Sequence, residues 1–113
     1  MIDLETILDN IEEEINLIKD KVENTIECYR FVRRSKEDQK FHIRIERSCK
    51  EDLLNMYKER CVSIKDDIDN LFKLSGNVFI PEEYLKKIES NISGKIDNII
   101  FDIDKFIDEG VYL

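Results

Sequence analysis

A seven-residue repeat runs without interruption through the first third of the chain. Apolar residues, with one threonine and one tyrosine, recur there in alternating steps of four and three: Leu4, Leu8, Ile11, Ile15, Ile18, Val22, Thr25, Tyr29 and Val32. This spacing keeps one face of an α-helix apolar, while the positions between are mostly charged. The first turn carries Asp3 and Glu5 and the last turn carries Arg33 and Arg34, and both choices complement the helix dipole. The repeat predicts one long helix over about residues 3–34.

A second long helix is expected over about residues 36–75. Its apolar residues form one stripe and then a heptad-like continuation: Phe41, Ile45, Cys49, Leu53 and Met56, followed by Leu54, Tyr57, Cys61, Ile64, Ile68 and Leu71. Ser35 and Asp38 resemble a capping box at its start. Residues 40–47 contain the alternating sequence FHIRIER, which has the period of a strand. We interpret it as helix, because the only candidate partner strand, residues 78–80, is too short for a stable hairpin.

The clearest break in the pattern is SGNVFIPEEY, residues 75–84. Gly76 suits the end of the second helix, and Pro81 suits the first position of a third, with Phe79 and Tyr84 spaced as a hydrophobic staple. The third helix is expected over residues 81–109, and its apolar residues are Leu85, Ile88, Ile92, Ile96, Ile99, Ile103 and Phe106. The step from Ile92 to Ile96 breaks the heptad at Ser93-Gly94. A kink or a short interruption is expected there.

Short connections between long helices make those helices antiparallel neighbours. We therefore expect the 113 residues to form one domain, an all-α antiparallel three-helix bundle of coiled-coil type. A four-helix arrangement is the alternative if Ser93-Gly94 is a true turn. Three narrow apolar seams leave part of their surface uncovered, so a homodimer or larger homo-oligomer is expected.

Charge is distributed unevenly along the chain. The net charge is −8, yet residues 28–50 carry eight lysines and arginines against three acidic residues. The turn between the first two helices falls inside this block, so the hairpin should have a basic tip. The members of this tip, which are the candidate partner-binding or anion-binding residues, are Arg30, Arg33, Arg34, Lys36, Lys40, Arg44 and Arg47.

Two interpretations of the basic tip remain open. In the first, it is neutralised inside the bundle or by a second subunit. The acidic residues near the end of the third helix would then lie near residues 44–50; they are Asp97, Asp102, Asp104, Asp108 and Glu109. In the second, the tip is a binding site, since arginine side chains match phosphate and carboxylate groups bidentately.

Motifs of catalysis and metal binding are not found in the sequence. The only histidine, His42, lies within the basic block, where neighbouring cations favour its neutral form. Cys28, His42, Cys49 and Cys61 lack the close-spaced pairs of structural zinc sites. No glycine-rich phosphate-binding loop is present. We therefore expect no enzymatic activity, no bound metal and no cofactor.

The three cysteines and the acidic N-terminal sequence indicate an intracellular, cytoplasmic protein. An odd number of cysteines without a secretory signal argues against a disulfide framework, and buried thiols are expected. No apolar run is long enough to span a membrane, and no association with one is expected. The chain has no alanine and eighteen isoleucines, a composition typical of an A/T-rich genome such as that of a virus or mobile element.

These features predict a non-enzymatic protein–protein interaction module: an oligomerising adaptor, regulator or inhibitor. The alternative is a module that binds nucleic acid or another polyanion through the arginines, with Tyr29, Phe31, Phe41 and His42 available for stacking on bases. The net charge of −8 opposes this alternative, because nucleic-acid-binding domains are usually basic overall. The acidic first helix offers a second surface, for a basic partner, unless it is simply a solvated helix face.

Overall fold

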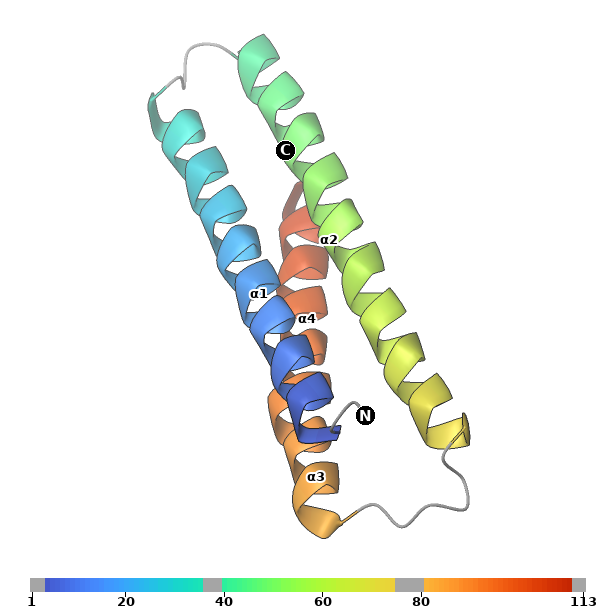
Figure 1. Cartoon of the computed structure of the whole chain (residues 1–113). Helices are drawn as coiled ribbons and strands as arrows, with labels where there is room; N and C mark the ends of the chain where they lie inside the picture. Colours follow the sequence, from blue (N-terminus) through green and yellow to red (C-terminus); the bar gives the residue numbers. More distant parts are fainter. Residues whose placement is uncertain (1–3, 36–39, 75–80, 111–113) are drawn as a thin grey trace.

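The computed structural model describes the backbone of residues 4–35, 40–74 and 81–110, and the side chains of these residues except 35, 41, 42, 71–74 and 110. Helices α1 (Leu4–Ser35) and α2 (Lys40–Leu74) are antiparallel. The third rod contains α3 (Glu82–Lys87), the π-helical turn η1 (Ile88–Ser93) and α4 (Gly94–Gly110) in direct succession. The three rods pack side by side in a molecule of 60 × 21 × 20 Å (Figure 1). The predicted all-α bundle is confirmed, and the described ranges contain no strand.

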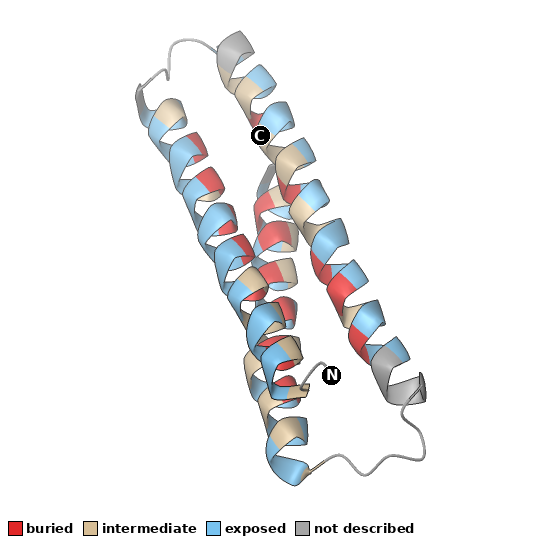
Figure 2. Ribbon diagram, in the orientation of Figure 1, coloured by how far each residue is buried: buried red, intermediate tan, exposed pale blue. Residues whose placement is uncertain are grey.

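Helix α1 follows its seven-residue repeat closely. Leu8, Ile15, Val22 and Tyr29, each seven positions apart, are all buried, as Figure 2 shows for the inner stripe of every rod. The one polar residue of this stripe, Thr25, is also buried, and its hydroxyl donates a hydrogen bond to the carbonyl of Lys21 at 2.7 Å. That bond satisfies the hydroxyl without a partner from another helix, so the seam stays continuous.

Helix α2 includes the alternating sequence of residues 41–47, so the helical interpretation is confirmed. Its buried stripe also has a spacing of seven, through Arg47, Leu54, Cys61 and Ile68. The predicted core stripe through Ile45, Cys49 and Met56 is wrong, because these side chains are exposed. They lie on the side of α2 opposite to the buried stripe, and α1 and α4 cover only the buried side. The expected capping box of Ser35 and Asp38 lies outside the described side chains.

The burial of the three cysteines follows from the same packing of one side of each helix. Cys61 is buried in the inner stripe, whereas Cys28 and Cys49 are exposed. The expectation of buried thiols is therefore correct for Cys61 and wrong for the other two. Burial raises the pKa of the Cys61 thiol, with the cation of Arg60 acting in the opposite direction. Cys61 thus behaves as a small apolar residue of the core.

The third rod begins one residue later than predicted. Pro81 has an extended backbone (φ −56°, ψ 143°) and is the N-cap, and its carbonyl accepts hydrogen bonds from the N–H groups of Tyr84 and Leu85. The expected roles of Gly76, Phe79 and residues 78–80 lie outside the described residues. Tyr84 packs against the core, while Leu85, predicted for the seam, is exposed.

The predicted irregularity near Ser93-Gly94 is a π-helical turn and not a chain reversal. The N–H of Gly94 donates to the carbonyl of Glu89, five positions back, and Gly94 itself has ordinary helical angles. Seam residues at 84, 88, 92 and 96 are separated by three consecutive steps of four. In an α-helix each such step overshoots a full turn by about 40°, so the seam would rotate away from its neighbours. The wider turn keeps Ile88, Ile92 and Ile96 buried, and the four-helix alternative is wrong.

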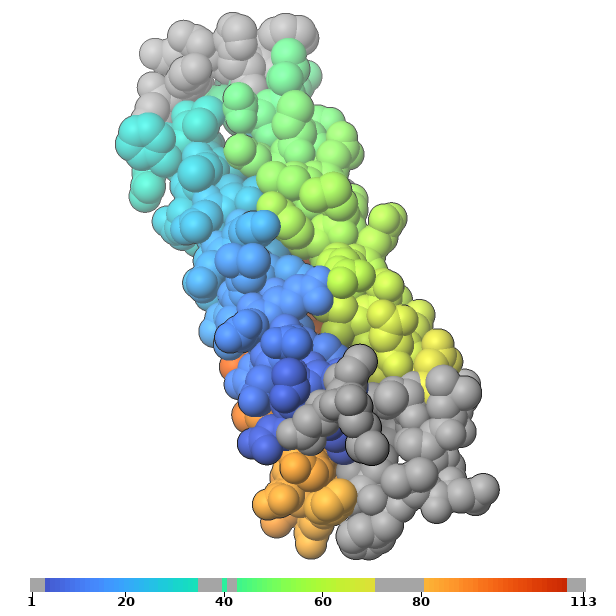
Figure 3. All heavy atoms as spheres, in the orientation of Figure 1, coloured from blue at the N-terminus to red at the C-terminus, as the bar shows by residue number. Residues whose placement is uncertain are grey.

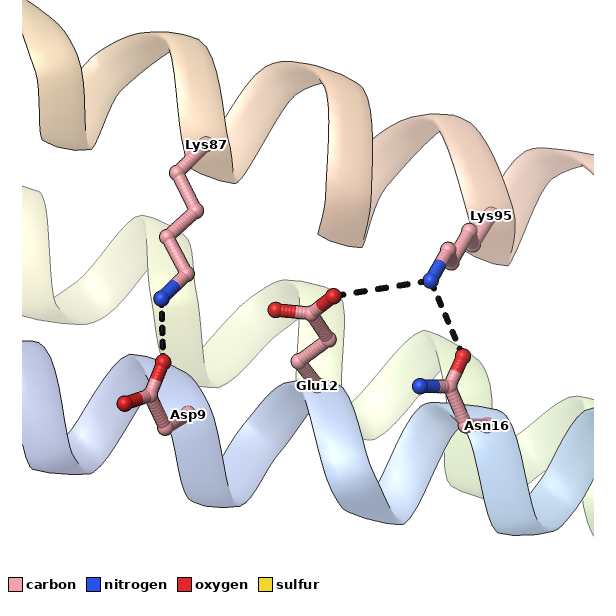
Figure 4. Close-up of polar contacts among 5 residues, drawn as sticks. All are labelled: Asp9, Glu12, Asn16, Lys87 and Lys95. Atoms are coloured by element: carbon pink, nitrogen blue, oxygen red, sulfur yellow. Dashed lines mark hydrogen bonds and ion pairs between the residues drawn. The ribbon is translucent and has the colours of Figure 1, made fainter.

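Ion pairs join the outer edges of the rods. The acidic half of α1 faces cations of the third rod, with Asp9 bonded to Lys87, and Lys95 placed 3.6 Å from Glu12 and 3.0 Å from the Asn16 side-chain oxygen (Figure 4). On the other edge, Arg60 of α2 donates to Glu14 at 2.6 Å. Part of the acidic surface of α1 is thus neutralised within the bundle. Such pairs contribute about 0–1 kcal/mol each and mainly fix the register between helices.

Candidate functional site

The candidate site is the end of the α1–α2 pair that extends beyond α4. We call residues 30–35 of α1 and 40–46 of α2 the apical hairpin. Figure 1 shows both helices continuing past the end of α4, and Figure 3 shows α1 and α2 in contact along the molecule with α4 largely hidden behind them. None of the described side chains of the apical hairpin is buried. The bundle therefore changes from three helices to two at this level.

Five cations of the predicted basic tip lie on the apical hairpin: Arg30, Arg33, Arg34, Lys40 and Arg44, all of them exposed. Arg30 forms an exposed ion pair with Glu27 at 3.0 Å. Within the described part of the chain, the other four form neither an ion pair nor a hydrogen bond. Lys36, also predicted for the tip, lies outside the described residues. The structure therefore brings most of the predicted cations together, and four of them have no internal counter-charge among the described side chains.

Arg47 differs from the other predicted tip residues because it is buried, with 8% of its surface exposed. Its guanidinium lies between two rings, 5.0 Å from the centre of Tyr29 and 4.1 Å from the centre of Phe106. Nε donates to Glu51 at 3.1 Å, and Nη2 donates to the carbonyl of Phe106. The rings of Tyr29 and Phe106 meet edge to face at 5.3 Å. Arg47 thus joins all three rods at the upper end of the core, and its inclusion in an exposed tip is corrected.

The burial of Arg47 has a signal in the sequence that the predicted stripes overlooked. Arg47 precedes Leu54, Cys61 and Ile68 at intervals of seven, so it occupies a seam position. A long side chain is accommodated there because α4 ends nearby, and helix C-terminal carbonyls attract cations. The stem and planar head also pack well against aromatic faces. On α2, the seam position that follows Arg47 toward the apical hairpin is Lys40, and none of the described residues of the third rod covers it.

The acidic residues of the third rod do not neutralise the apical hairpin in the predicted way. Asp97 binds Lys65 at 3.0 Å and Asp104 binds Lys58 at 2.6 Å, which places both well below residues 44–50. The contact between the end of α4 and residues 44–50 is made by the carbonyl of Phe106, through Arg47. The axial position of the third rod explains this correction, because Glu109 lines the same hollow as Arg30 but α4 ends at Gly110, before it reaches the other apical cations (Figure 1).

A hollow of about 360 Å³ lies between α1 and α4, directly below the apical hairpin. Val22, Ile26 and Phe106 supply apolar surface, and Arg30 marks the apical side. Four carboxylates, Glu23, Glu27, Asp102 and Glu109, line it together with Lys105. The hollow is therefore acidic on balance. The cations of the apical hairpin lie directly above these carboxylates. An extended polyanion on this side of the molecule would therefore be repelled where it passed from the cations to the hollow.

Side chains that ligate metals are dispersed in the described part of the chain. Among the described residues, no three His, Cys, Asp or Glu side chains are grouped so that they could bind a metal ion together. None of the described helices combines the length and apolar character that crossing a membrane requires.

The chain matches no protein-family model, and no curated protein or solved structure shows significant similarity to it.

Proposed function

We propose that this protein is a non-enzymatic interaction module, an adaptor, regulator or inhibitor, whose apical hairpin binds an acidic surface of a protein partner inside the cell. One observation carries the proposal. Arg33, Arg34, Lys40 and Arg44 are exposed beyond the end of α4 and have no ion pair among the described residues, whereas the cations of the three-helix region largely do. Unpaired arginines on a rigid helical scaffold suit recognition of carboxylates.

An acidic protein surface suits the site better than a nucleic acid does. The molecule has a net charge of −8, and the hollow below the apex contributes four carboxylates close to the cations. Fields are screened over about 8–10 Å at physiological salt, so the apical cations attract only what lies near them. A compact acidic patch can meet the apex alone, whereas a long phosphate backbone would also meet the carboxylates.

Nucleic acid is the second candidate, and Phe31 favours it. This ring is 65% exposed and lies three positions before Arg34, an arrangement suited to stacking on an unpaired base. Self-association is also part of the proposal, since an apical hairpin could meet the acidic α1 of a second copy.

The test compares three ligands on one protein: poly-L-glutamate, single-stranded RNA and duplex DNA, each titrated over a range of salt concentrations. We expect poly-L-glutamate to bind at low salt and to be released as salt rises. Arg33→Glu/Arg34→Glu should abolish this binding, whereas Lys19→Glu/Lys21→Glu, which changes the net charge equally on exposed positions of α1, should preserve it.

The outcomes separate the candidates. Tight RNA or DNA binding, lost in the apical variant, would favour the nucleic-acid function. The slope of log K against log salt should then be no steeper than about −4, because the described part of the apical hairpin carries four cations without an ion pair. Sedimentation velocity of the protein alone reports self-association. Loss of a dimer in the apical variant would indicate that the partner is a second copy.

A further inference from the structure

The ion pairs between α2 and α4 form a regular ladder. Lys65 pairs with Asp97, and Lys58, seven positions earlier, pairs with Asp104, seven positions later. The same repeat on α2 continues through position 51 to Arg44. Glu51 binds Arg47, and α4 ends at Gly110, before it can reach Arg44. Arg44 is therefore a position of this ladder without a carboxylate partner among the described residues.

The inner seam of the bundle continues past α4 in the same way. Lys40 lies seven positions before Arg47 on the stripe that buries Leu54 and Cys61, and Arg33 lies four positions after the buried Tyr29. Residues at these spacings share one face of a helix. The seam of α2 thus ends in the exposed Lys40, and the exposed Arg33 flanks the seam position Val32 on α1.

An apolar strip lies between these cations. Val32 and Ile43 are partly buried, and Ile43 packs against the upper end of the core. They follow Tyr29 by three positions and precede Arg47 by four, so they lie on the inner faces of α1 and α2. Together with Arg33 and Arg44, they lie on the part of the apical hairpin that extends past the end of α4 (Figure 1).

We infer that this inner face of the apical hairpin binds an acidic amphipathic helix of a partner protein, which continues the line of α4 along the apical hairpin. Its apolar residues pack on Val32 and Ile43, one carboxylate faces Arg44 of α2 as Asp104 faces Lys58, and a carboxylate on its other edge faces Arg33 of α1. The inference rests on the proposed function and specifies its partner. A helix fits because Arg44 lies two repeats of seven beyond Lys58, on the same row of α2 whose lysines already pair with carboxylates of the helix α4.

The length of this face sets the expected affinity. The described part of α2 in the apical hairpin spans seven residues, about 10 Å or two helical turns. A contact of this length falls in the class of small, transient interfaces, below about 1,200 Å². Dissociation constants should therefore be micromolar, and binding should weaken with salt.

The probe is a synthetic peptide with the sequence of residues 94–110, labelled with a fluorophore, because α4 already packs on α1 and α2 with this pattern of acids. Two control peptides carry either Asp97→Asn/Asp104→Asn or Ile99→Pro. The first removes the ladder carboxylates, and the second retains every charge but prevents a continuous helix. Binding to the full-length protein is measured by fluorescence anisotropy.

We expect the parent peptide to bind and the asparagine peptide to bind at least about tenfold more weakly, as loss of one or two charge-assisted bonds implies. The proline peptide should also bind at least about tenfold more weakly, because it cannot present its side chains on one continuous helical face. In the protein, Arg33→Glu/Arg44→Glu should remove binding, Arg33→Gln/Arg44→Gln should reduce it, and Lys19→Glu/Lys21→Glu should leave it unchanged. Circular dichroism confirms that each variant remains helical.

Three results would overturn the inference. Equal binding of the proline peptide, still dependent on the apical arginines, would retain an acidic partner but reject a helix. Tighter binding of single-stranded RNA in competition would change the class of partner. Absence of any arginine-dependent binding, by the peptides or by poly-L-glutamate, would reject both the helix and the proposed function.

Discussion

The three-helix region and the apical hairpin are built from the same two helices with the same seven-residue repeat. In the three-helix region the repeat of α2 buries residues such as Leu54 and Cys61, while on the apical hairpin the corresponding position carries the exposed Lys40. The change occurs at Arg47, where α4 ends. The comparison teaches that the chemistry of a seam position here depends on whether a third helix covers it. Four predictions test how sharp this division is.

The largest effect is expected from shortening a core side chain. Leu54 is fully buried, whereas Ile45 of the apical hairpin is 47% exposed on the outer face of α2. Leu54→Ala should lower the free energy of unfolding by about 2–5 kcal/mol, and Ile45→Ala by less than about 0.5 kcal/mol. Urea unfolding followed by circular dichroism measures both. Similar losses for the two variants would mean that the outer face is covered in solution.

The arginine at the boundary should matter for stability, unlike its apical neighbours. Arg47→Ala removes a side chain stacked between Tyr29 and Phe106 together with its bond to the Phe106 carbonyl, and should cost about 2 kcal/mol. Arg47→Met retains the packing and should cost about half as much. Arg44→Ala, the matched exposed control, should remain within about 0.5 kcal/mol of the parent in the same urea titration. If the Arg47→Ala variant had the same free energy of unfolding as the parent, the contacts of Arg47 with Tyr29 and Phe106 would add no stability.

The hydroxyl of Tyr29 should be dispensable. It is buried and has no hydrogen-bond partner among the described residues, so folding removes it from water without compensation. Tyr29→Phe keeps the ring contact with Phe106 and should raise the free energy of unfolding by up to about 1 kcal/mol. A loss of stability on thermal and urea unfolding would instead indicate that the hydroxyl has a partner.

The smallest effect concerns pH. The hydrogen bond with Asp9 raises the pKa of Lys87 above its ordinary value of 10.5. Because the folded state holds this proton more tightly, the stabilisation is complete below pH 10.5 and is lost as pH rises through the raised pKa. The stability difference between the parent and Lys87→Gln should therefore shrink at alkaline pH. Lys86→Gln, whose exposed pair with Glu82 is 3.7 Å long, is the control and should show no such trend.

The periodicity of single helices predicted most of the fold. The repeat of α1 predicted its limits to within one residue, and the absence of a partner strand predicted the helical state of residues 41–47. The burial of Arg47 and the exposure of Ile45, Cys49 and Met56 were missed, because α2 carries apolar residues on two faces and only packing selects between them. The basic tip was predicted as a cluster. The position of this cluster relative to the end of α4 was not predicted. How far the third rod extends along the bundle depends on contacts between helices, and the pattern of a single helix does not encode those contacts.

The π-helical turn η1 has a consequence for how the third rod can vary in length. Between Ile88 and Ile92 the chain contains one residue more than a regular heptad repeat requires. If that surplus residue were deleted, the seam from Tyr84 to Phe106 would read in strictly alternating steps of four and three, which an ordinary α-helix accommodates. The bundle should therefore tolerate a single deletion at an exposed position of η1, such as Ser90, better than one in α4. The third rod can thus lose one residue in η1 while its apolar seam stays aligned with the neighbouring helices.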